Sequence, residues 1–599
     1  MRKILTLLLI LSPLFCWPDQ PTPSAKPKSL VLTHVTVIDA SGAAAKPEMT
    51  VVIIGDRIAE MGKNGEIRPP QNAETVNGEG KFLIPGLWDM HVHWYEKDYL
   101  PLFIANGVTG VRQMFGSPSH YQWRKEVEAG QWLGPHMLIA SPIVDGPKPV
   151  WPGSIAVANA SEARQAVIQV KRNGADFVKV YSLLSRDAYF AIADESKKQG
   201  IPFEGHVPES VSLEEASNAG QKSIEHLTGV LIACSTREAE LLRSAQDTSA
   251  AIAAGQLSST GFWGPEYRQR EKLALESYSP VKAATVFKQL QKNHTWQCPT
   301  LTVLRSMAFS DDRSFTDDPR LKYIPRDIVS SWDPKADIFL KTKTAEDWAL
   351  SKEVFQKELA LVGAMQRAGV EILAGTDTLN PYCFPGFSLH DELGLLVQSG
   401  LTPMQALQAA TLKPARFLGR EKDLGTVAAG KIADLVLLDA NPLDDIGNTR
   451  KISAVVFGGK YFSKASLYEM LAKIEALASR PSIAEVLLKI IQDQNVDAAI
   501  EQYYHLRTTQ PTTYDFGESA LDGLGESLEE IKKFKEAIRI FELNVETNPS
   551  SYTYDTLGEA CVTAGDRDCA LKSFRKALEL SPNDTNATER LKKLNAPSQ

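Results

Sequence analysis

Hydrophobic and polar positions alternate differently in three parts of the chain, and the first part is typical of β-structure. Residues 29–82 contain short β-branched runs, such as 35–39, separated by glycine, alanine and proline, which predicts short strands. Similar runs return at 430–439 and 454–460. We therefore expect residues 29–82 and 420–465 to form one composite β-sandwich from two distant stretches of chain.

The middle part, residues 83–419, alternates strand-like and helix-like segments. This alternation favours a parallel sheet with helical crossovers, and the length suits an eight-stranded barrel with insertions. Polar helical residues interrupt the regular spacing at 234–294 and 309–352, where we expect the insertions. The predicted fold class is α/β, with a TIM-like (β/α)8 barrel next to the sandwich.

The last part, residues 466–599, contains a repeat with an offset of 33 positions. The repeated pairs are Leu524-Gly525 and Leu557-Gly558, Ala537 and Ala570, Phe541 and Phe574, and Pro549 and Pro582. These positions match the tetratricopeptide (TPR) pattern, and residues 483–508 read as a degenerate helix pair that caps the stack. A generic helical bundle is the alternative, because two full repeats are fewer than the three that a solenoid usually needs.

The N-terminus has the pattern of an export signal. Arg2 and Lys3 precede an apolar run over 4–14 that is too short to span a bilayer. We expect residues 1–17 to be a signal peptide, followed by a Pro-rich linker over 18–28, and the protein to be periplasmic or extracellular. A buried N-terminal helix would leave the two basic residues unexplained. Lipidation of Cys16 is not expected, because Phe15 before it is bulky.

Composition and charge narrow the class of partner. The chain has a net charge of −8 with mixed signs and no long basic block, which argues against binding to nucleic acid and for a small-molecule or protein partner. The 6 cysteines do not make a disulfide scaffold in 599 residues. An oxidising compartment would permit a disulfide between Cys561 and Cys569, although its strict geometry argues against expecting one.

Candidate chemistry gathers at the ends of strand-like runs in the middle part. His91 and His93 are two apart on a strand, so both imidazoles point to one face. This H-x-H pattern is weak evidence alone, but further strand ends carry Lys179, His206, His226 and Asp377, where barrel enzymes place their chemistry. A buried, unpaired ammonium is costly, so Lys179 either reaches a carboxylate or is modified.

These residues resemble the metal-dependent amidohydrolases, in the branch that contains imidazolonepropionase and Xaa-Pro-dipeptidase-like enzymes. The resemblance covers about residues 29–462. It is carried by segments 86–93, 176–181, 205–206, 223–226, 375–377, 401–407 and 425–439. The resemblance implies that His91, His93 and Asp377 bind one metal ion, that His206 and His226 bind a second, and that a carbamylated Lys179 bridges them.

The implied chemistry is hydrolysis of an amide-like C–N bond. Two divalent ions, expected to be zinc, would share a hydroxide and orient it toward a polarised carbonyl. Asp377 would take the proton of this water and return it to the leaving nitrogen. The expected substrates are a dipeptide, an N-acyl amino acid or a cyclic amide. Heterocycle deamination is one alternative, and a TPR-mediated binding protein with a degenerate barrel is another.

Two further residues are candidates for substrate binding. Tyr181 shares the inward face of Lys179 and would bond the substrate carbonyl, unless it is a packed core residue. Arg112 would hold a substrate carboxylate, or would pair with a carboxylate of the barrel, which is the reading we prefer. The segment 204–208 has fewer histidines than is usual in the dipeptidases of the family, which weakens any transfer of dipeptide specificity.

Overall fold

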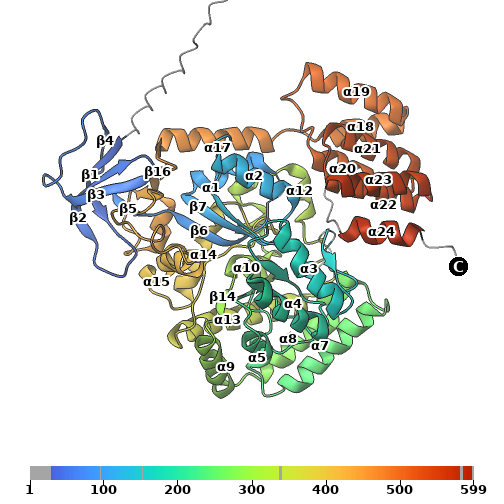
Figure 1. Ribbon diagram of the computed structural model, residues 1–599, viewed down its shortest axis with the longest axis horizontal. Coiled ribbons are helices and arrows are strands. Elements are labelled where there is room, and N and C mark those ends of the chain that lie inside the picture. Colours follow the sequence, from blue (N-terminus) through green and yellow to red (C-terminus); the bar gives the residue numbers. More distant parts are fainter. Residues whose placement is uncertain are drawn as a thin grey trace, which may run out of the picture.

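The computed structural model describes residues 29–94, 96–151, 153–335, 337, 340–580 and 585–595. The predicted signal peptide, the linker over 18–28 and Cys16 lie outside these residues. Figure 1 shows a group of strands at one end of the molecule, parallel strands with helices in its centre, and a helical tail at the other end.

The β-unit is one eight-stranded sheet with the order β17-β16-β15-β5-β1-β2-β3, in which β4 pairs with β1. Its strands are β1 (Ser29–Val37), β2 (Lys46–Ile54), β3 (Arg57–Lys63), β4 (Glu74–Asn77), β5 (Phe82–Pro85), β15 (Leu435–Leu438), β16 (Ile452–Phe457) and β17 (Lys460–Ser463). The two distant stretches of chain meet where β15 runs antiparallel to β5, with Val436 opposite Ile84. The strands are connected as a single sheet, whereas the sequence suggested a sandwich.

Nine parallel strands of the centre lie in two sheets. The three-stranded sheet has the order β6-β7-β8, and the six-stranded sheet has the order β10-β9-β11-β12-β13-β14. The strands are β6 (Leu87–Val92), β7 (Val108–Gln113), β8 (His136–Ile139), β9 (Val144–Asp145), β10 (Ile155–Ala156), β11 (Val178–Val180), β12 (Phe203–Gly205), β13 (Ser223–Glu225) and β14 (Trp296–Cys298).

Isolated parallel bridges connect the two sheets. Ala140, after β8, pairs with Phe177, before β11, at one junction. At the other, the segment after residue 370 lies between the sheets: Ile372 pairs with Gln297 of β14, and Thr378 pairs with Val92 of β6. Residues 370–374 pair with β14 through the Ile372 bridge without forming a regular strand, so the predicted single eight-stranded sheet is interrupted here. The parallel arrangement with helical crossovers agrees with the α/β prediction.

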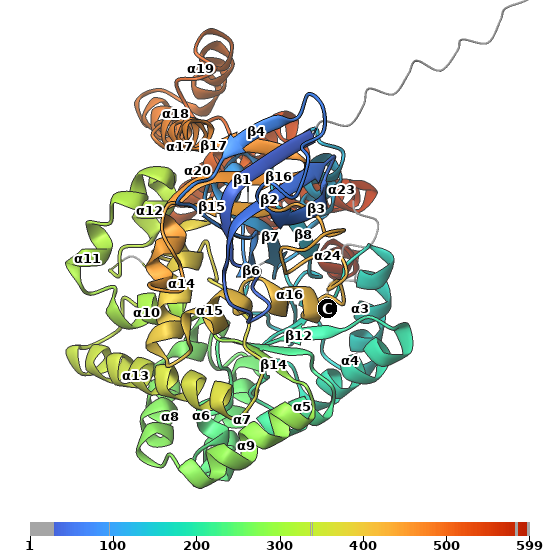
Figure 2. The same ribbon diagram turned by 90° about the vertical axis from the view of Figure 1, so that its left-hand side faces the viewer.

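Helices cover the parallel strands on the outside (Figure 2). They are η1 (Lys97–Tyr99), α1 (Pro101–Ala105), α2 (Pro118–Glu128), α3 (Ala160–Arg172), α4 (Arg186–Gln199), α5 (Leu213–Asn218), α9 (Pro280–Lys292), α14 (Phe387–Gln398), α15 (Pro403–Ala409), α16 (Leu412–Phe417) and η4 (Ile446–Arg450). In α3, Asn159 accepts bonds from the first-turn amides, and Ala163, Val167 and Val170 bury one face.

Helices fill both predicted insertions. The first contains α7 (Glu238–Ala253), η2 (Ser259–Trp263) and α8 (Pro265–Glu276), after the short α6 (Val230–Ala233). The second lies between α10 (Leu301–Phe309) and the start of the long α13 (Ala345–Arg367), and contains α11 (Arg313–Thr316), η3 (Pro319–Tyr323) and α12 (Arg326–Ser331). Helix α8 packs against both α7 and α13, so the two inserted regions contact each other.

The C-terminal tail is helical, as predicted. Its helices are α17 (Lys464–Ala478), α18 (Ile483–Asp493), α19 (Val496–Thr509), α20 (Glu518–Glu530), α21 (Phe534–Thr547), α22 (Ser551–Thr563), α23 (Arg567–Leu580) and α24 (Thr585–Asn595). Helix α17 runs from the β-unit toward the stack of the others (Figure 1), and this stack has a hydrophobic core of its own. No helix among the described residues has the length and apolar character needed to cross a membrane.

Cys561 and Cys569 form a disulfide, although geometry argued against expecting one from the sequence. They lie eight residues apart, at the two sides of the turn between α22 and α23. The other described cysteines, Cys234, Cys298 and Cys383, are buried thiols. The disulfide therefore closes one helical hairpin of the tail.

The 33-residue repeat has a packing explanation. Gly525 of α20 lies under the ring of Phe541 from α21, and Gly558 of α22 lies under the ring of Phe574 from α23. A Cβ atom on Gly525 would come within 2.4 Å of the Phe541 ring, and one on Gly558 within 2.5 Å of Phe574. Each glycine therefore lets two helices approach closely.

We expect Gly525→Ala to destabilise the tail by about 1–3 kcal/mol, because the added methyl group overpacks a buried ring. Gly523→Ala in the same helix is the matched control, since its Cβ would meet no atom within 4 Å and alanine favours the helix. Urea unfolding followed by circular dichroism measures both. Equal stability of the two variants would contradict the packing explanation.

Candidate metal and substrate site

His91 and His93 lie at the carboxyl end of β6 and face Asp377. The distance from Nε2 to Asp377 Oδ1 is 3.2 Å for His91 and 3.0 Å for His93. The three side chains form a group whose ligand atoms are close enough to share one ion. The structure thus brings together the three residues that the resemblance assigns to the first metal ion.

The turn that carries Asp377 is fixed against β6. The Asp377 amide donates to the carbonyl oxygen of His91 at 2.8 Å, and its φ of 60° lies in the left-handed region. A Cβ atom on Gly375 would come within 2.9 Å of the His91 amide nitrogen, so only glycine permits this approach. The turn therefore delivers Asp377 directly to the two histidines.

Asp89 holds the same turn, and the sequence analysis missed this role. Its carboxylate accepts bonds from the Thr376 amide at 3.0 Å and from the Thr376 hydroxyl at 2.7 Å. Burial raises the pKa of Asp89 to about 7, although these bonds and His91 lower it. The signal was present, because Asp89 precedes His91 by two positions and shares its strand face.

Lys179, His206 and His226 come from three neighbouring parallel strands. Lys179 lies in β11, His206 directly follows β12 and His226 directly follows β13. The ring centres of His226 and His91 are 4.5 Å apart, and those of His206 and His226 are 5.0 Å apart. Because the carboxyl ends of parallel strands meet at one edge, these side chains join the His91 group.

A hydrogen bond at Nδ1 orients each of three imidazoles. His91 contacts Glu225 at 2.8 Å, His206 contacts Ser182 Oγ at 2.9 Å, and His226 contacts Thr300 Oγ1 at 2.7 Å. Burial lowers the pKa of His226 to about 3 and that of His206 well below the usual value. The rings of His206 and His226 are therefore neutral at pH 7, which is the form that binds metal.

Lys179 is buried among these groups. Its side chain makes no ion pair with a carboxylate within the described part of the chain, and its Nζ lies 6.0 Å from the centre of the Tyr181 ring. Burial lowers the pKa of this ammonium to about 8, even though Glu225 and Asp377 raise it. Of the two alternatives raised by the sequence, direct pairing with a carboxylate is not observed.

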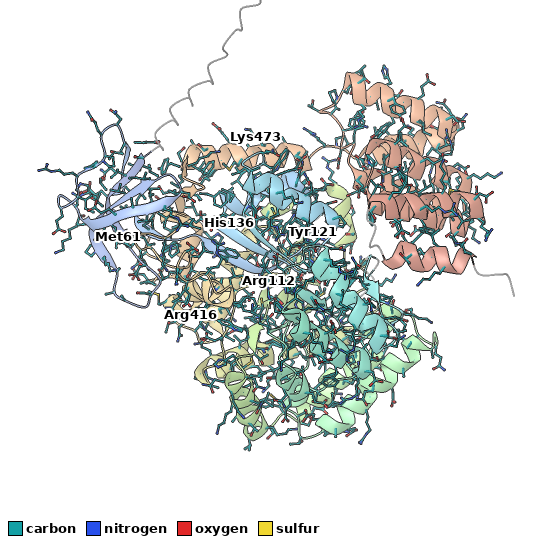
Figure 3. All side chains as sticks on the ribbon, in the orientation of Figure 1. Met61, Arg112, Tyr121, His136, Arg416 and Lys473 are labelled. Carbon is teal, nitrogen blue, oxygen red and sulfur yellow. A yellow bond between two sulfur atoms is a disulfide. The ribbon has the colours of Figure 1, made fainter. Side chains whose placement is uncertain are left out.

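Arg112 corrects the assignment to substrate binding. Its guanidinium is fully buried on β7 (Figure 3), donates to Glu204 at 2.6 Å and bonds Glu225 through both carboxylate oxygens at 2.9 and 3.0 Å. Further bonds reach the Met90 carbonyl and the Ser223 hydroxyl. With its donors used inside the protein, Arg112 positions carboxylates of the parallel strands, which agrees with the interpretation that we preferred from the sequence.

Tyr181 lines the cavity next to the histidines. Its ring centre is 4.0 Å from that of His206, and its hydroxyl accepts a bond from Trp151 Nε1 at 2.8 Å. Because the oxygen is the acceptor in this bond, the bond does not use the hydroxyl proton. Tyr181 is both packed and polar here, so the two readings of the sequence are compatible.

A cavity of about 360 Å³ opens from this group. At its inner end lie His93, Lys179, His206, His226 and Asp377. Residues of the two insertions build much of the remaining wall, among them Phe262, Trp263, Tyr267, Leu340 and Lys343. Sequence reasoning located the insertions but gave no indication that they face the ligand group.

The donor set fits a divalent metal ion. His91 Nε2 and Asp377 Oδ1 face each other, and both are buried without a hydrogen-bond partner among the described residues. Buried polar atoms are normally paired, so two unpaired atoms in one group need an explanation. Imidazole and carboxylate are ligands suited to zinc and similar ions.

Parallel strands, strand-end histidines and a buried aspartate form a candidate metal site in an α/β fold. The chain belongs to the amidohydrolase family, whose model matches residues 82–462. Among solved structures, a bottromycin amidohydrolase has a TM-score of 0.60 at 24% identity and covers 76% of this chain and 91% of its own. A Xaa-Pro dipeptidase with bound methionine has a TM-score of 0.52 at 19% identity, covering 73% and 100%.

Similar sequences match over shorter stretches. Imidazolonepropionase from Shouchella clausii (strain KSM-K16) is 35% identical over 137 residues, which is 21% of this chain and 30% of the relative. A 5-methylthioadenosine/S-adenosylhomocysteine deaminase from Moorella thermoacetica (strain ATCC 39073 / JCM 9320) is 39% identical over 88 residues, or 14% and 21%. The matches thus span less than a third of these curated relatives.

We expect Glu225→Gln to weaken metal binding by about 10–100-fold, because the carboxylate that orients His91 loses its charge. Glu204→Gln is the matched control, since Glu204 also pairs with Arg112 but does not contact His91. Both variants should lose up to about 3–5 kcal/mol of stability, because each disturbs a buried ion pair. Competition with a chelator measures zinc affinity, and an equal loss in both variants would contradict this role of Glu225.

Proposed function

We propose that the protein is a metal-dependent hydrolase that cleaves an amide-like C–N bond of a small molecule. The observation that carries the proposal is the group of His91, His93 and Asp377, with two unpaired buried ligand atoms at the end of a cavity. Membership of the amidohydrolase family supports it. We also propose that the bridged parallel strands form one TIM-type barrel, since bridges span two junctions between the sheets.

Two divalent ions, zinc by preference of the ligands, would be held by the six strand-end residues. His91, His93 and Asp377 would hold one ion, His206 and His226 the other, and a carbamylated Lys179 would bridge them. When bound, the ions supply Lewis acidity for the substrate carbonyl and a water of lowered pKa. A carbamate would convert a costly buried ammonium into an anionic oxygen ligand.

The residues of the chain supply the proton transfers. Burial would raise the pKa of Asp377, but His226 and His91 hold it well below the usual range, so the carboxylate is ionised and accepts the proton of the attacking water. It then returns the proton to the leaving nitrogen. The Tyr181 hydroxyl lies in the cavity beside His206, where it can donate to the substrate carbonyl.

Dipeptides, N-acyl amino acids and cyclic amides are the substrates that this site suits. The matches to an imidazolonepropionase and a Xaa-Pro dipeptidase support a cyclic amide or a dipeptide. Heterocycle deamination is the second candidate, supported by the match to a deaminase. A screen with added zinc distinguishes them, because deamination releases ammonia whereas amide hydrolysis releases a carboxylate.

The tail and the N-terminus suggest where the enzyme acts. We propose that residues 466–599 are a TPR-like module that binds a protein partner, and that residues 1–17 direct export to the periplasm or beyond. The separate core of the tail supports a module, and the disulfide between Cys561 and Cys569 supports an oxidising compartment. Complete loss of hydrolysis in a folded variant truncated after residue 465 would contradict the proposal for the tail. Finding the chain unprocessed in the cytosol would contradict the proposal for export.

We expect Asp377→Asn to lower kcat by about 10²–10⁴-fold at full metal occupancy, because the amide keeps an oxygen ligand but cannot accept the proton. His91→Ala should instead lose metal first. Elemental analysis fixes the metal content of each preparation, with about two divalent ions expected in the wild type. Near-normal turnover of metal-saturated Asp377→Asn would contradict the assignment.

We expect Lys179 to carry a carbamate in the metal-loaded enzyme. Labelling with ¹³C-bicarbonate should give a carbamate signal by NMR that Lys179→Ala lacks, and short carboxylic acids should restore part of the activity lost in that variant. Lys179→Arg is the control. Arginine fills the space and keeps the charge, but it cannot form the bridging carbamate, and it leaves no room for a rescuing acid. An unmodified Lys179 between two bound ions would contradict the prediction.

A further inference from the structure

Opposite the strand-end residues, the cavity is lined by the first insertion and by helix α13, which begins in the second insertion and extends past it. Helix α8 contributes Tyr267 and Glu271, helix α13 contributes Glu358, and η2 contributes Phe262 and Trp263. These residues lie outside the set assigned to metal or proton transfer. Because they belong to inserted helices, they can determine which substrate enters without altering the strand ends.

Most charged groups on this wall have partners. Arg268 pairs with Asp347 at 3.0 Å, and Arg270 pairs with Glu209 at 3.3 Å. Lys343 is held by neutral groups, the Met307 carbonyl at 2.8 Å and the Ser351 hydroxyl at 2.9 Å. These arrangements account for the three cations and for one of the carboxylates of the wall.

Two carboxylates remain, Glu271 and Glu358. Neither forms an ion pair with a cation in the described part of the chain, and they lie near enough to interact with each other. Burial raises the pKa of Glu271 to about 7, and burial with the charge of Glu271 raises that of Glu358 well above its usual value. Lys343 lowers the pKa of Glu271, but no cation in the described part of the chain does so for Glu358, which holds a proton at pH 7. A cationic ligand would stabilise both carboxylates in their charged form.

Aromatic rings adjoin the two carboxylates. The centres of Phe262 and Trp263 are 4.7 Å apart, and those of Phe262 and Tyr267 are 5.6 Å apart. Tyr267 interacts with Glu271, Glu209 and Glu358. Ring faces attract cations and exclude water, which strengthens the attraction of a nearby carboxylate. An anionic ligand would be repelled at the same place.

We propose that this part of the cavity binds a singly charged ammonium or guanidinium group of the substrate, with Glu271 and Glu358 as the specificity residues. The proposal rests on the proposed hydrolysis at the other end of the cavity. The substrate is then an extended amide with its scissile bond at the strand-end histidines and its cationic group between α8 and α13. Aliphatic atoms between the two ends would lie along the aromatic wall.

Paired substrates test the proposal in the wild-type enzyme. Dipeptides that contain lysine, at either position, are compared with the same dipeptides containing norleucine, which lacks only the charged amine. We expect kcat/KM to be at least about tenfold higher for lysine in one of the two positions. Equal values for lysine and norleucine at both positions would overturn the inference and leave the proposed hydrolysis intact.

Variants locate the effect. Glu271→Gln and Glu358→Gln should each reduce the preference for lysine while leaving hydrolysis of the norleucine dipeptide within about twofold of wild type. Glu353→Gln, on an exposed position of the same helix α13, is the matched control and should keep the preference. An unchanged preference in the double variant Glu271→Gln/Glu358→Gln, folded by circular dichroism, would overturn the assignment.

A binding measurement separates this inference from the proposed function. Isothermal titration calorimetry of the full chain should detect hexylammonium but not hexanol, and the double variant should lose the hexylammonium signal. Binding without hydrolysis of any amide would support the cation subsite and contradict the proposed function. Equal binding of hexylammonium by wild type and double variant would overturn the subsite whatever the enzyme hydrolyses.

Discussion

The buried guanidinium of Arg112 is the interaction on which the site depends. It connects β7 to Glu204 of β12 and Glu225 of β13, and Glu225 in turn holds Nδ1 of His91 on β6. Without this cation, the buried Glu225 would lose its guanidinium partner and Glu204 would keep only Lys222 at 3.7 Å, and a buried carboxylate that loses its partner is strongly destabilising. With it, the His91 ring is oriented so that Nε2 faces Asp377. The Arg112 guanidinium thus holds the strands, the two carboxylates and the candidate metal ligand His91 in place.

The strand ends explain why the ligand group forms where it does. Residues on parallel strands converge at the carboxyl ends, and side chains two apart share a face, so Asp89 and His91 point inward together. Asp89 then holds the Thr376 turn, which delivers Asp377. The buried network around Arg112 therefore compensates the charge of its carboxylates. The side chains that face the cavity keep their imidazoles neutral and their ligand atoms without hydrogen bonds. The two groups need different residues, because a side-chain atom that pairs inside the protein cannot also bind a metal ion.

The local sequence pattern predicted much of this arrangement. The rest could not be predicted, because it depends on contacts between residues far apart in the sequence. The histidines, Lys179 and Asp377 were visible because each ends a strand-like run, and the helical tail was visible from its repeat. The contact between Arg112 and Glu225 joins residues 113 positions apart, and no local pattern shows it. The wall made by α8 and α13 was missed for the same reason, since insertions interrupt a pattern without revealing what they face. The interrupted parallel sheet arises where residues 370–374 pair through bridges alone.

The structure separates three tasks that the chain must combine. Parallel strands and their buried charges hold the ligand group, and a change there alters stability and metal binding together. Inserted helices face the far end of the same cavity, with Glu271 and Glu358 outside the Arg112 network, so their charges can vary without disturbing the ligands. The tail buries its own core, in which glycine lies under phenylalanine in each full repeat. The ligand group, the inserted wall and the tail therefore depend on different packing interactions and can change independently of one another.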